Sequence, residues 1–585
     1  MRAARWGCAV DQPANGGHDP AVRPRSAVPR LCAVALPALL GSVACSTVPT
    51  RATPSGPVVA TELGAVRGVE RNGALEFRGI PYAAPPVGDL RFAPPRPGIP
   101  WTGVRDASDF GASCPQTRRY DLTERSTTED CLFLNVSLPA DLRPGERLPV
   151  LAWIHGGAFV GGSSSLYRLD RLAVQGRLVV VSFNYRPGLL GFMAVKGLDA
   201  EANGGAGLED QRLALRWIQR NVAAFGGDPG NVTLAGESAG AGSTCMHLVS
   251  PDRVAGLFHR AIVQSAGCLQ PMPTLAASLD DSDPSRPPAW RQVALRVGCG
   301  AATDVLTCLR AASVESLLAA QDAVSSGLMT FGPIVGNGTV PLQAREAIRL
   351  GSVSRVPLLM GGTRDELRLY VAYAKLFSPF VSDWSEAKLR SFWLPAYYGA
   401  DAPDPSAPGR TLHDAIVAEY ARGGAMDGAS LGSMLSDHQV AVGITNCLYL
   451  RTSDALLDLV PAVYQFEFAD PAAPVLGVGI AKGMDPGFPL GAVHSSELNY
   501  LFPGYSNTSA MDGPALAPAS QALADRMVEA WASFAATGAP RAAGLPPWPR
   551  YGKGGRQVML LVPGDPAPYD AGARHRCAFW DRTYP

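Results

Sequence analysis

The chain has 585 residues, and its 51 lysines and arginines balance its 51 aspartates and glutamates, so the formal net charge is zero. A neutral chain with 17% charged residues lacks the basic surface that binds nucleic acid, and its 47% hydrophobic content excludes a disordered protein. No internal repeat of 20–50 residues is evident. The composition therefore indicates a globular protein with a large core.

Three arginines precede an apolar run at the amino terminus, which is the pattern of an export signal. The run, residues 31–44, is too short and too interrupted by proline to span a membrane. Small residues end it, so we expect the mature chain to begin near Cys45. Residues 1–45 are therefore predicted to be a signal peptide or lipoprotein leader, and 46–57 a flexible linker before a domain over 58–585.

The amino-terminal pattern fits three cellular locations of the protein. A cysteine at the cleavage site indicates a lipid anchor at Cys45, but Ser42 stands where such sites usually have an aliphatic residue. The alternative is a buried apolar segment of a cytosolic protein. We expect secretion, with a lipoprotein on the outer face of the cell membrane as the second interpretation.

Short strands with turn signals are expected over 59–110, and the pattern changes from residue 147 onward. Continuous apolar runs, typical of buried parallel strands, then alternate with helical patterns such as 210–226. The runs cover 147–157, 177–186, 230–238, 356–366, 461–470 and 558–564. This alternation predicts an α/β fold, a mostly parallel central sheet with helices on both faces and its site at the carboxyl ends of the strands. Residues 270–330 and 371–435 interrupt it and are predicted to be helical insertions over that edge.

The third run leads into a G-x-S-x-G motif, Gly236-Glu237-Ser238-Ala239-Gly240. A sharp turn from strand to helix exposes the central serine, and glycines on either side remove Cβ clashes. The small residues that follow begin a helix whose N–H groups face the reacting centre. We therefore predict that Ser238 is a nucleophile rather than an ordinary turn serine.

A second glycine loop, HGGAF at 155–159, ends the first apolar run. Its glycines allow backbone N–H groups to approach the oxyanion of a tetrahedral intermediate. Gly156 and Gly157 are predicted to form an oxyanion hole together with Ala239. His155 precedes the nucleophile and is interpreted as structural.

A serine nucleophile needs a base that takes its proton and an acid that orients the base. Where the serine lies in a G-x-S-x-G turn of this kind, the acid and the base both follow it in the chain. Asp365 and Glu366 end the fourth run, and spacing alone does not choose between them. Four histidines follow, His413, His438, His494 and His575. His494 lies in a glycine-bounded loop before an apolar segment, which suits a mobile catalytic loop, but the pattern leaves the choice open.

Eight cysteines follow the leader, and none has the spacing of a zinc site. We therefore expect disulfides, an oxidising compartment and no bound metal. Short separations make 114/131 and 299/308 natural loop-closing pairs, and a long-range 447/577 pair would tie down the carboxyl terminus, but spacing alone does not fix the pairing.

Seven motifs occur together along the chain: FRGIPYAAPPVGDLRF (77–92), EDCLFLNV (129–136), HGGAF (155–159), NYRPGLLGF (184–192), FGGDPGNVTLAGESAGAGS (225–243), GGTRDE (361–366) and GAVHSSELNYLF (491–502). Together they resemble the type-B carboxylesterases and lipases, the cholinesterase-like branch of the α/β-hydrolases. The resemblance covers residues 58–585 and implies the α/β-hydrolase fold.

The resemblance implies a serine carboxylic-ester hydrolase that forms an acyl-enzyme and needs no metal or organic cofactor. It assigns the base to His494 and the acid to Glu366. Glu237, beside the nucleophile, is expected to line the active site through a hydrogen-bond network, with a simple salt bridge as the alternative. The implied substrate is a small-molecule ester, and the oligomeric state is left open. A lipase, thioesterase or amidase on the same triad is an alternative, as is a non-catalytic binding protein on the same scaffold.

The resemblance also implies an ion pair between Arg91 and Glu129 and three disulfides, Cys114–Cys131, Cys299–Cys308 and Cys447–Cys577. It leaves Cys245 and Cys268 as buried thiols. The chain departs from the family in having Leu367 where a glycine usually follows the acid. The first disulfide loop lacks the tryptophan with which cholinesterases bind quaternary ammonium, so choline esters are not the expected substrates.

Overall fold

The computed structural model describes residues 56–584, except 118–123, 326–329, 378–384, 405–406, 421–425, 476–483 and 553–554. The predicted leader, including Cys45, and nearly all of the predicted linker lie outside the described residues. In the part of the chain that is described, no helix combines the length and apolar character that a membrane crossing needs.

Eleven strands form one large sheet in the order β14-β13-β12-β11-β10-β9-β7-β8-β6-β4-β3. The strands from β8 to β13 run parallel, and antiparallel strands extend the sheet at both edges. The strands are β3 (Val69–Arg71), β4 (Ala74–Pro81), β6 (Phe133–Pro139), β7 (Leu148–Ile154), β8 (Val179–Phe183), β9 (Gly227–Glu237), β10 (Arg260–Gln264), β11 (Leu358–Thr363), β12 (Val463–Phe468), β13 (Gln557–Leu561) and β14 (Ala567–Asp570). A separate small sheet contains β1 (Val58–Ala60), β2 (Ala65–Arg67) and β5 (Val104–Asp106).

All six predicted apolar runs form strands, namely β7, β8, β9, β11, β12 and β13. The mostly parallel sheet is therefore confirmed. The prediction omitted β6, β14 and β10, the last of which has only three consecutive apolar residues in its sequence RAIVQ. Within the sheet, β10 lies between β9 and β11, so it separates the strands that carry the predicted nucleophile and acid.

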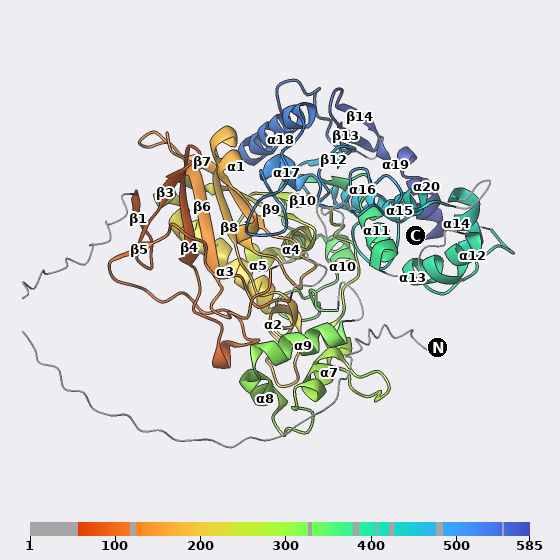
Figure 1. Ribbon diagram of the computed structural model, residues 1–585, viewed down its shortest axis with the longest axis horizontal. Helices are drawn as coiled ribbons and strands as arrows, with labels where there is room; N and C mark the ends of the chain where they lie inside the picture. The colour runs from red at the N-terminus through yellow and green to blue at the C-terminus, as the bar shows by residue number, and fades with distance from the viewer. Residues whose placement is uncertain are drawn as a thin grey trace, which may run out of the picture. The chain divides into compact units, whose positions relative to one another are not determined.

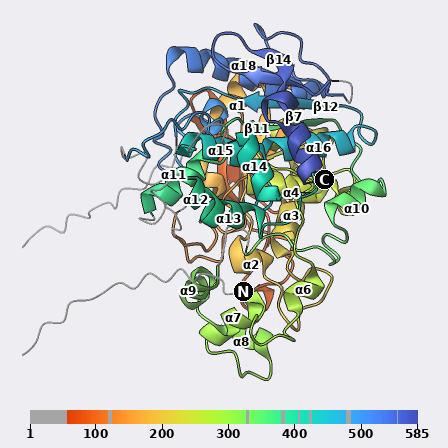
Figure 2. The same ribbon diagram turned by 90° about the vertical axis from the view of Figure 1, so that its right-hand side faces the viewer.

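Helices cover both faces of the sheet because alternate residues of each buried strand point to opposite sides. On β7, Leu151 and Trp153 pack with α1 (Asp170–Gly176) and α18 (Pro518–Thr537) in one core. Val150 and Ile154 pack in a second core on the opposite face. That face carries α3 (Ala206–Asn221), α4 (Ala239–Leu248) and α16 (Asn446–Leu456). Figures 1 and 2 show α1 and α18 side by side, away from α3 and α4.

The two predicted insertions are helical. The first contains α6 (Leu275–Leu279), α7 (Ala289–Arg296), α8 (Val305–Ala311) and α9 (Val314–Val324). The second contains α11 (Arg368–Phe377), α12 (Glu386–Lys388), α13 (Leu394–Tyr398), α14 (Leu412–Tyr420) and α15 (Gly428–Asp437). In both views α7, α8 and α9 lie together, apart from the second group (Figures 1 and 2).

The remaining helices are short connections and a carboxyl-terminal pair. They are α2 (Gly188–Phe192), α5 (Pro251–Val254), α10 (Ala344–Arg349), α17 (Leu498–Leu501), α19 (Ala571–Arg574) and α20 (Cys577–Thr583). Short 3-10 turns occur at Gly88–Leu90, Ser164–Leu166 and Val222–Phe225, and a π-helical turn at Leu389–Trp393.

Candidate active site

The turn between β9 and α4 holds Ser238 in a backbone conformation that few residues adopt. Its φ is 56° and its ψ is −122°, a sparsely populated region that costs about 1–3 kcal/mol. Glycine is required on both sides: a Cβ at Gly236 would lie 2.5 Å from the Gly240 carbonyl, and one at Gly240 would lie 2.1 Å from the carbonyl oxygen of Ile154. The strained backbone at Ser238 and the close packing at the two glycines together hold the Ser238 hydroxyl at the carboxyl end of β9.

Three side chains from distant parts of the chain form a continuous relay. The Ser238 hydroxyl lies 2.9 Å from Nε2 of His494, and Nδ1 of the same ring lies 2.7 Å from Oε2 of Glu366. Glu366 is fully buried and His494 is 7% exposed. Because the carboxylate only accepts at Nδ1, it favours the tautomer whose Nε2 is free to take the serine proton.

Fixed donors orient the Glu366 carboxylate. Its Oε1 accepts from the backbone N–H of Thr363 and from the hydroxyl of Tyr449, each at 2.9 Å. This leaves Oε2 for His494. The geometry therefore distinguishes Glu366 from Asp365, which the sequence pattern did not.

Asp365 holds the loop that carries the histidine. Its Oδ2 accepts from the backbone N–H of Ala492 at 3.1 Å, and its Oδ1 lies 3.0 Å from Arg368, which also donates to the carbonyl of Pro489. Burial raises the pKa of the Asp365 carboxyl, although Arg368 opposes the shift. Leu367, where the family usually has glycine, is buried, and its N–H donates to Ser436, so the turn still presents Glu366 to the histidine.

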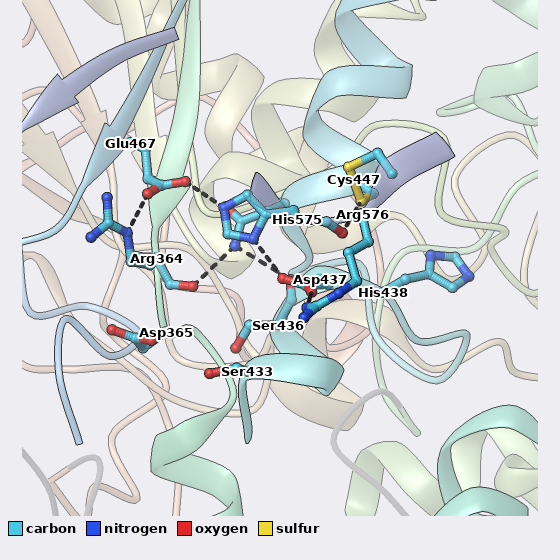
Figure 3. A network of polar contacts seen from close by, with 12 residues as sticks. Arg364, Asp365, Ser433, Ser436, Asp437, His438, Cys447, Glu467, His575 and Arg576 are labelled. Carbon is cyan, nitrogen blue, oxygen red and sulfur yellow. Dashed lines mark hydrogen bonds and ion pairs between the residues drawn. A yellow bond between two sulfur atoms is a disulfide. The ribbon is translucent and has the colours of Figure 1, made fainter. Parts of the chain in front are cut away.

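Of the other histidines that follow Glu366, His575 makes the most polar contacts (Figure 3). Its Nδ1 and Nε2 each lie 2.5 Å from a carboxylate, Asp437 and Glu467 respectively, and Arg364 binds the second oxygen of Glu467. Burial alone would lower the pKa of His575, but Glu467 and Asp437 raise it to about 10. With both ring nitrogens paired to carboxylates, this histidine is an ion-paired link to the carboxyl terminus.

His413, His438 and His155 do not contact Ser238 either. His413 is buried and lies 3.8 Å from Asp401. Burial lowers the pKa of His438 to about 3 and that of His155 to about 4. His155 stacks on Tyr185, which agrees with its interpretation as structural.

Two further buried carboxyl groups surround His494. Glu237 lies 3.4 Å from its Nε2 and accepts from the Ser495 hydroxyl at 2.6 Å, while Glu497 accepts from Gln264 at 3.1 Å. Burial raises the pKa of Glu237, and burial together with the neighbouring carboxylates raises that of Glu497 to about 8. Burial alone would lower the pKa of His494, but Glu237 and Glu366 raise it to about 9. Glu497 was not identified from the sequence, since nothing in the pattern indicated that its charge acts on the histidine.

The loop at 155–159 lies against the nucleophile. A Cβ at Gly156 would meet the Glu237 carboxylate at 2.7 Å, so only glycine fits there. The N–H of Gly156, however, donates to the Tyr167 hydroxyl at 3.4 Å. The N–H groups of Gly157, Ala158 and Ala239 have no acceptor among the described residues. These three donors, rather than Gly156, are therefore available to a ligand.

A small apolar cavity of about 60 Å³ opens beside Ser238. Three segments form its walls: the 158–159 turn with α4, the loop after β10, and residues 442–444 with Tyr370. The lining residues are Ala158, Phe159, Ser238, Ala239, Gly242, Ala266, Gly267, Gln270, Met272, Tyr370, Val442, Gly443 and Ile444.

The disulfides correct one prediction. The expected pairs Cys114–Cys131, Cys299–Cys308 and Cys447–Cys577 are all present. Cys245 and Cys268, expected to be thiols, form a fourth disulfide with their Cα atoms 5.1 Å apart. These residues meet because β10, omitted from the prediction, places the loop that follows it beside α4.

The expected ion pair between Arg91 and Glu129 is present, with two nitrogen–oxygen contacts of 2.7 and 2.6 Å. Arg91 also donates to the carbonyls of Arg310 and Ala312 and so connects the amino-terminal region to the first insertion. Among the described residues, no cluster of three or more histidine, cysteine, aspartate or glutamate side chains is arranged to hold a metal ion.

The mostly parallel sheet, the serine turn after β9 and the histidine–carboxylate pair define an α/β-hydrolase. Comparisons with known proteins place the chain among the carboxylesterases. A family model described as "Carboxylesterase family" matches residues 55–580. Para-nitrobenzyl esterase of Bacillus subtilis (strain 168) is 33% identical over 523 residues, covering 86% of this chain and 94% of that protein. Pyrethroid hydrolase Ces2a of Mus musculus is 31% identical over 553 residues, covering 91% and 92%.

Solved structures agree. A carboxylesterase of Geobacillus stearothermophilus has a TM-score of 0.71 and 30% sequence identity, covering 89% of this chain and 99% of that one. A structure described as PNB esterase also has a TM-score of 0.71 at 30% identity, covering 91% and 100%. The chain belongs to the carboxylesterase family and is a carboxylic ester hydrolase.

Proposed function

We propose that the enzyme cleaves small-molecule esters through an acyl-enzyme intermediate, with Ser238 as nucleophile, His494 as general base and Glu366 as the orienting acid. The observation that supports this assignment is the unbroken relay from the strained Ser238 turn through His494 to the buried Glu366. Each contact is within hydrogen-bonding distance, and Glu366 is held by two further donors.

In the acylation step, Nε2 of His494 takes the Ser238 proton as Oγ attacks the ester carbonyl. The positive charge that develops on the ring is stabilised by Glu366 at Nδ1 and by the nearby Glu237. The imidazolium then protonates the leaving alcohol. Water attacks the acyl-enzyme by the same route and releases the acid.

The oxyanion of both tetrahedral intermediates is proposed to bind the backbone N–H groups of Gly157, Ala158 and Ala239. Removing one such donor typically costs about 3 kcal/mol of transition-state stabilisation. The donor predicted at Gly156 is replaced by Ala158 in this proposal, because the Gly156 N–H is engaged by Tyr167. Ala239 is the first residue of α4, so its N–H lies at the positive end of the helix dipole, which stabilises the negative charge of the oxyanion.

The cavity beside Ser238 is proposed to hold the acyl group. The leaving alcohol needs a proton from His494 and therefore lies on the histidine side of Ser238, whereas His494 is not among the described residues that line the cavity. The cavity is small, about 60 Å³, and apolar, which favours a short acyl chain over a long one.

We also propose that the enzyme is secreted, as the amino-terminal pattern predicts. Four disulfides within the described residues support an oxidising compartment. The intact mass of the mature protein from its native source distinguishes free secretion from a lipid anchor at Cys45, because acylation adds the mass of the fatty chains.

Hydrolysis of short p-nitrophenyl esters tests the assignment. Ser238→Ala is expected to abolish turnover while leaving thermal unfolding little changed, since the hydroxyl is only half-buried and makes one side-chain contact. Undiminished activity of this variant would refute the role of Ser238. Thioesters and amides in the same panel show whether the relay accepts other leaving groups.

A further inference from the structure

The unexpected disulfide lies beside the proposed acyl cavity. Cys245 is on α4, the helix that begins directly after Ser238, and Cys268 is in the loop that follows β10. The two cysteines are 1% and 2% exposed, so the bond is buried. Ala266 and Gly267, immediately before Cys268, line the cavity.

This loop also supports the opposite wall. The N–H of Gly267 donates to the carbonyl of Gly443 at 2.8 Å, and Gly443 itself lines the cavity. A Cβ at Gly267 would lie 2.3 Å from Cγ of Leu448, so the loop packs tightly against α16. A displacement of the loop would therefore move two of the three segments that enclose the acyl group.

The disulfide is the direct link between the loop and the nucleophile helix. Within the described residues, no hydrogen bond joins α4 to 266–270. The other anchors of the loop point elsewhere: Ser265 donates to Gly361 on β11, and Met272 pairs with Gln343. The Ser238 N–H donates to the carbonyl of Gln264 at 2.9 Å and joins the end of β10 to the start of α4. Beyond that point, the covalent bond ties residues 266–270 to the helix.

We propose that the Cys245–Cys268 disulfide determines acyl-chain selectivity. It holds the wall at Ala266 and Gly267 against α4 and so restricts the cavity to short acyl groups. This proposal rests on the proposed function, because acyl length matters only where the acyl group is transferred to Ser238.

The test compares kcat/KM for p-nitrophenyl butyrate and octanoate in the Cys245→Ala/Cys268→Ala variant. Without the covalent link, the wall moves away from α4, and the preference for butyrate over octanoate is expected to fall about tenfold, the effect of a methylene or two in an apolar pocket. A second variant, Cys245→Ala/Cys268→Val, restores the lost apolar volume without the link and should show the same fall. Both are expected to unfold at a lower temperature.

The matched control is Cys299→Ala/Cys308→Ala, which removes a disulfide whose residues lie in a separate core with α7 and α9. It should also lower the unfolding temperature but leave the butyrate-to-octanoate ratio unchanged. An unchanged ratio in the folded Cys245 variants would overturn the proposal, as would the failure of both to fold, which assigns the bond to stability alone. Absence of ester hydrolysis by the wild-type enzyme is a different result and would refute the proposed function itself.

Discussion

Replacing Glu366 with glutamine isolates the role of the acid, because the change keeps the shape of the side chain and removes its charge. Oε1 of Glu366 faces two donors, the N–H of Thr363 and the hydroxyl of Tyr449. In the Glu366→Gln variant the amide oxygen must occupy that position, since the backbone N–H of Thr363 cannot become an acceptor. The amide NH₂ then faces Nδ1 of His494.

An NH₂ group opposite Nδ1 makes that nitrogen an acceptor and moves the imidazole proton to Nε2. In this tautomer His494 cannot take the Ser238 proton. The reversed amide would pair with the histidine but leave the buried Thr363 N–H unpaired, which costs about 1–3 kcal/mol. An acid-to-amide change in a serine triad lowers kcat by about 10⁴. We expect a loss of about 10³–10⁴-fold, equivalent to about 4–5.5 kcal/mol of activation free energy.

The assay is kcat for p-nitrophenyl butyrate at saturating substrate, together with thermal unfolding. Asp365→Asn is the matched control, because it makes the same chemical change one residue earlier. Its amide oxygen still accepts from the Ala492 N–H, so we expect kcat to fall less than tenfold. A tenfold fall corresponds to about the free energy of one neutral hydrogen bond. A folded Glu366→Gln enzyme that retains kcat within tenfold of the wild type would refute the tautomer argument.

Three further predictions concern the turn between β9 and α4, the buried carboxylate of Glu237 and the disulfide at the carboxyl terminus. Gly240→Ala places a Cβ 2.1 Å from the Ile154 carbonyl oxygen and displaces the nucleophile, so kcat should fall by about 100-fold; full activity would show that the turn tolerates a side chain. Glu237→Gln removes a charge that raises the pKa of His494, so the ascending limb of the kcat/KM–pH profile should move to lower pH, and a shift to higher pH would reverse the assigned sign. Cys447→Ala/Cys577→Ala opens a link across 130 residues and should lower the free energy of unfolding by about 4–5 kcal/mol, measured by denaturant titration; an unchanged midpoint would contradict the entropic estimate.

The sheet was largely predictable because its central strands are buried on both faces and are therefore continuously apolar. The runs that became β7, β9 and β11 also end in glycine motifs, which mark where the chain turns over the edge of the sheet. In contrast, β10 offers only Ala261, Ile262 and Val263 as consecutive apolar residues. So short a run cannot be distinguished from a helix or loop by periodicity.

The features that the residue pattern left open depend on the direction in which side chains point. The pattern alone did not choose between Asp365 and Glu366, although the family resemblance assigned Glu366; in the structure Asp365 accepts from the loop backbone and Glu366 from the imidazole. The family resemblance implied that Cys245 and Cys268 are thiols, whereas they form a disulfide between α4 and the loop after β10, a strand that was not predicted. Glu497 carries no local signature, since its importance comes from the buried carboxylates around it.

Covalent labelling with a fluorophosphonate, followed by peptide mass spectrometry, tests the central claim most directly. Such a reagent reacts with a serine hydroxyl only where a base activates it and an oxyanion site receives the phosphoryl oxygen. We predict one label per chain, on the peptide containing Ser238, and none in the Ser238→Ala or His494→Ala variants. Labelling of a different residue, or an unlabelled enzyme that still hydrolyses esters, would contradict the account.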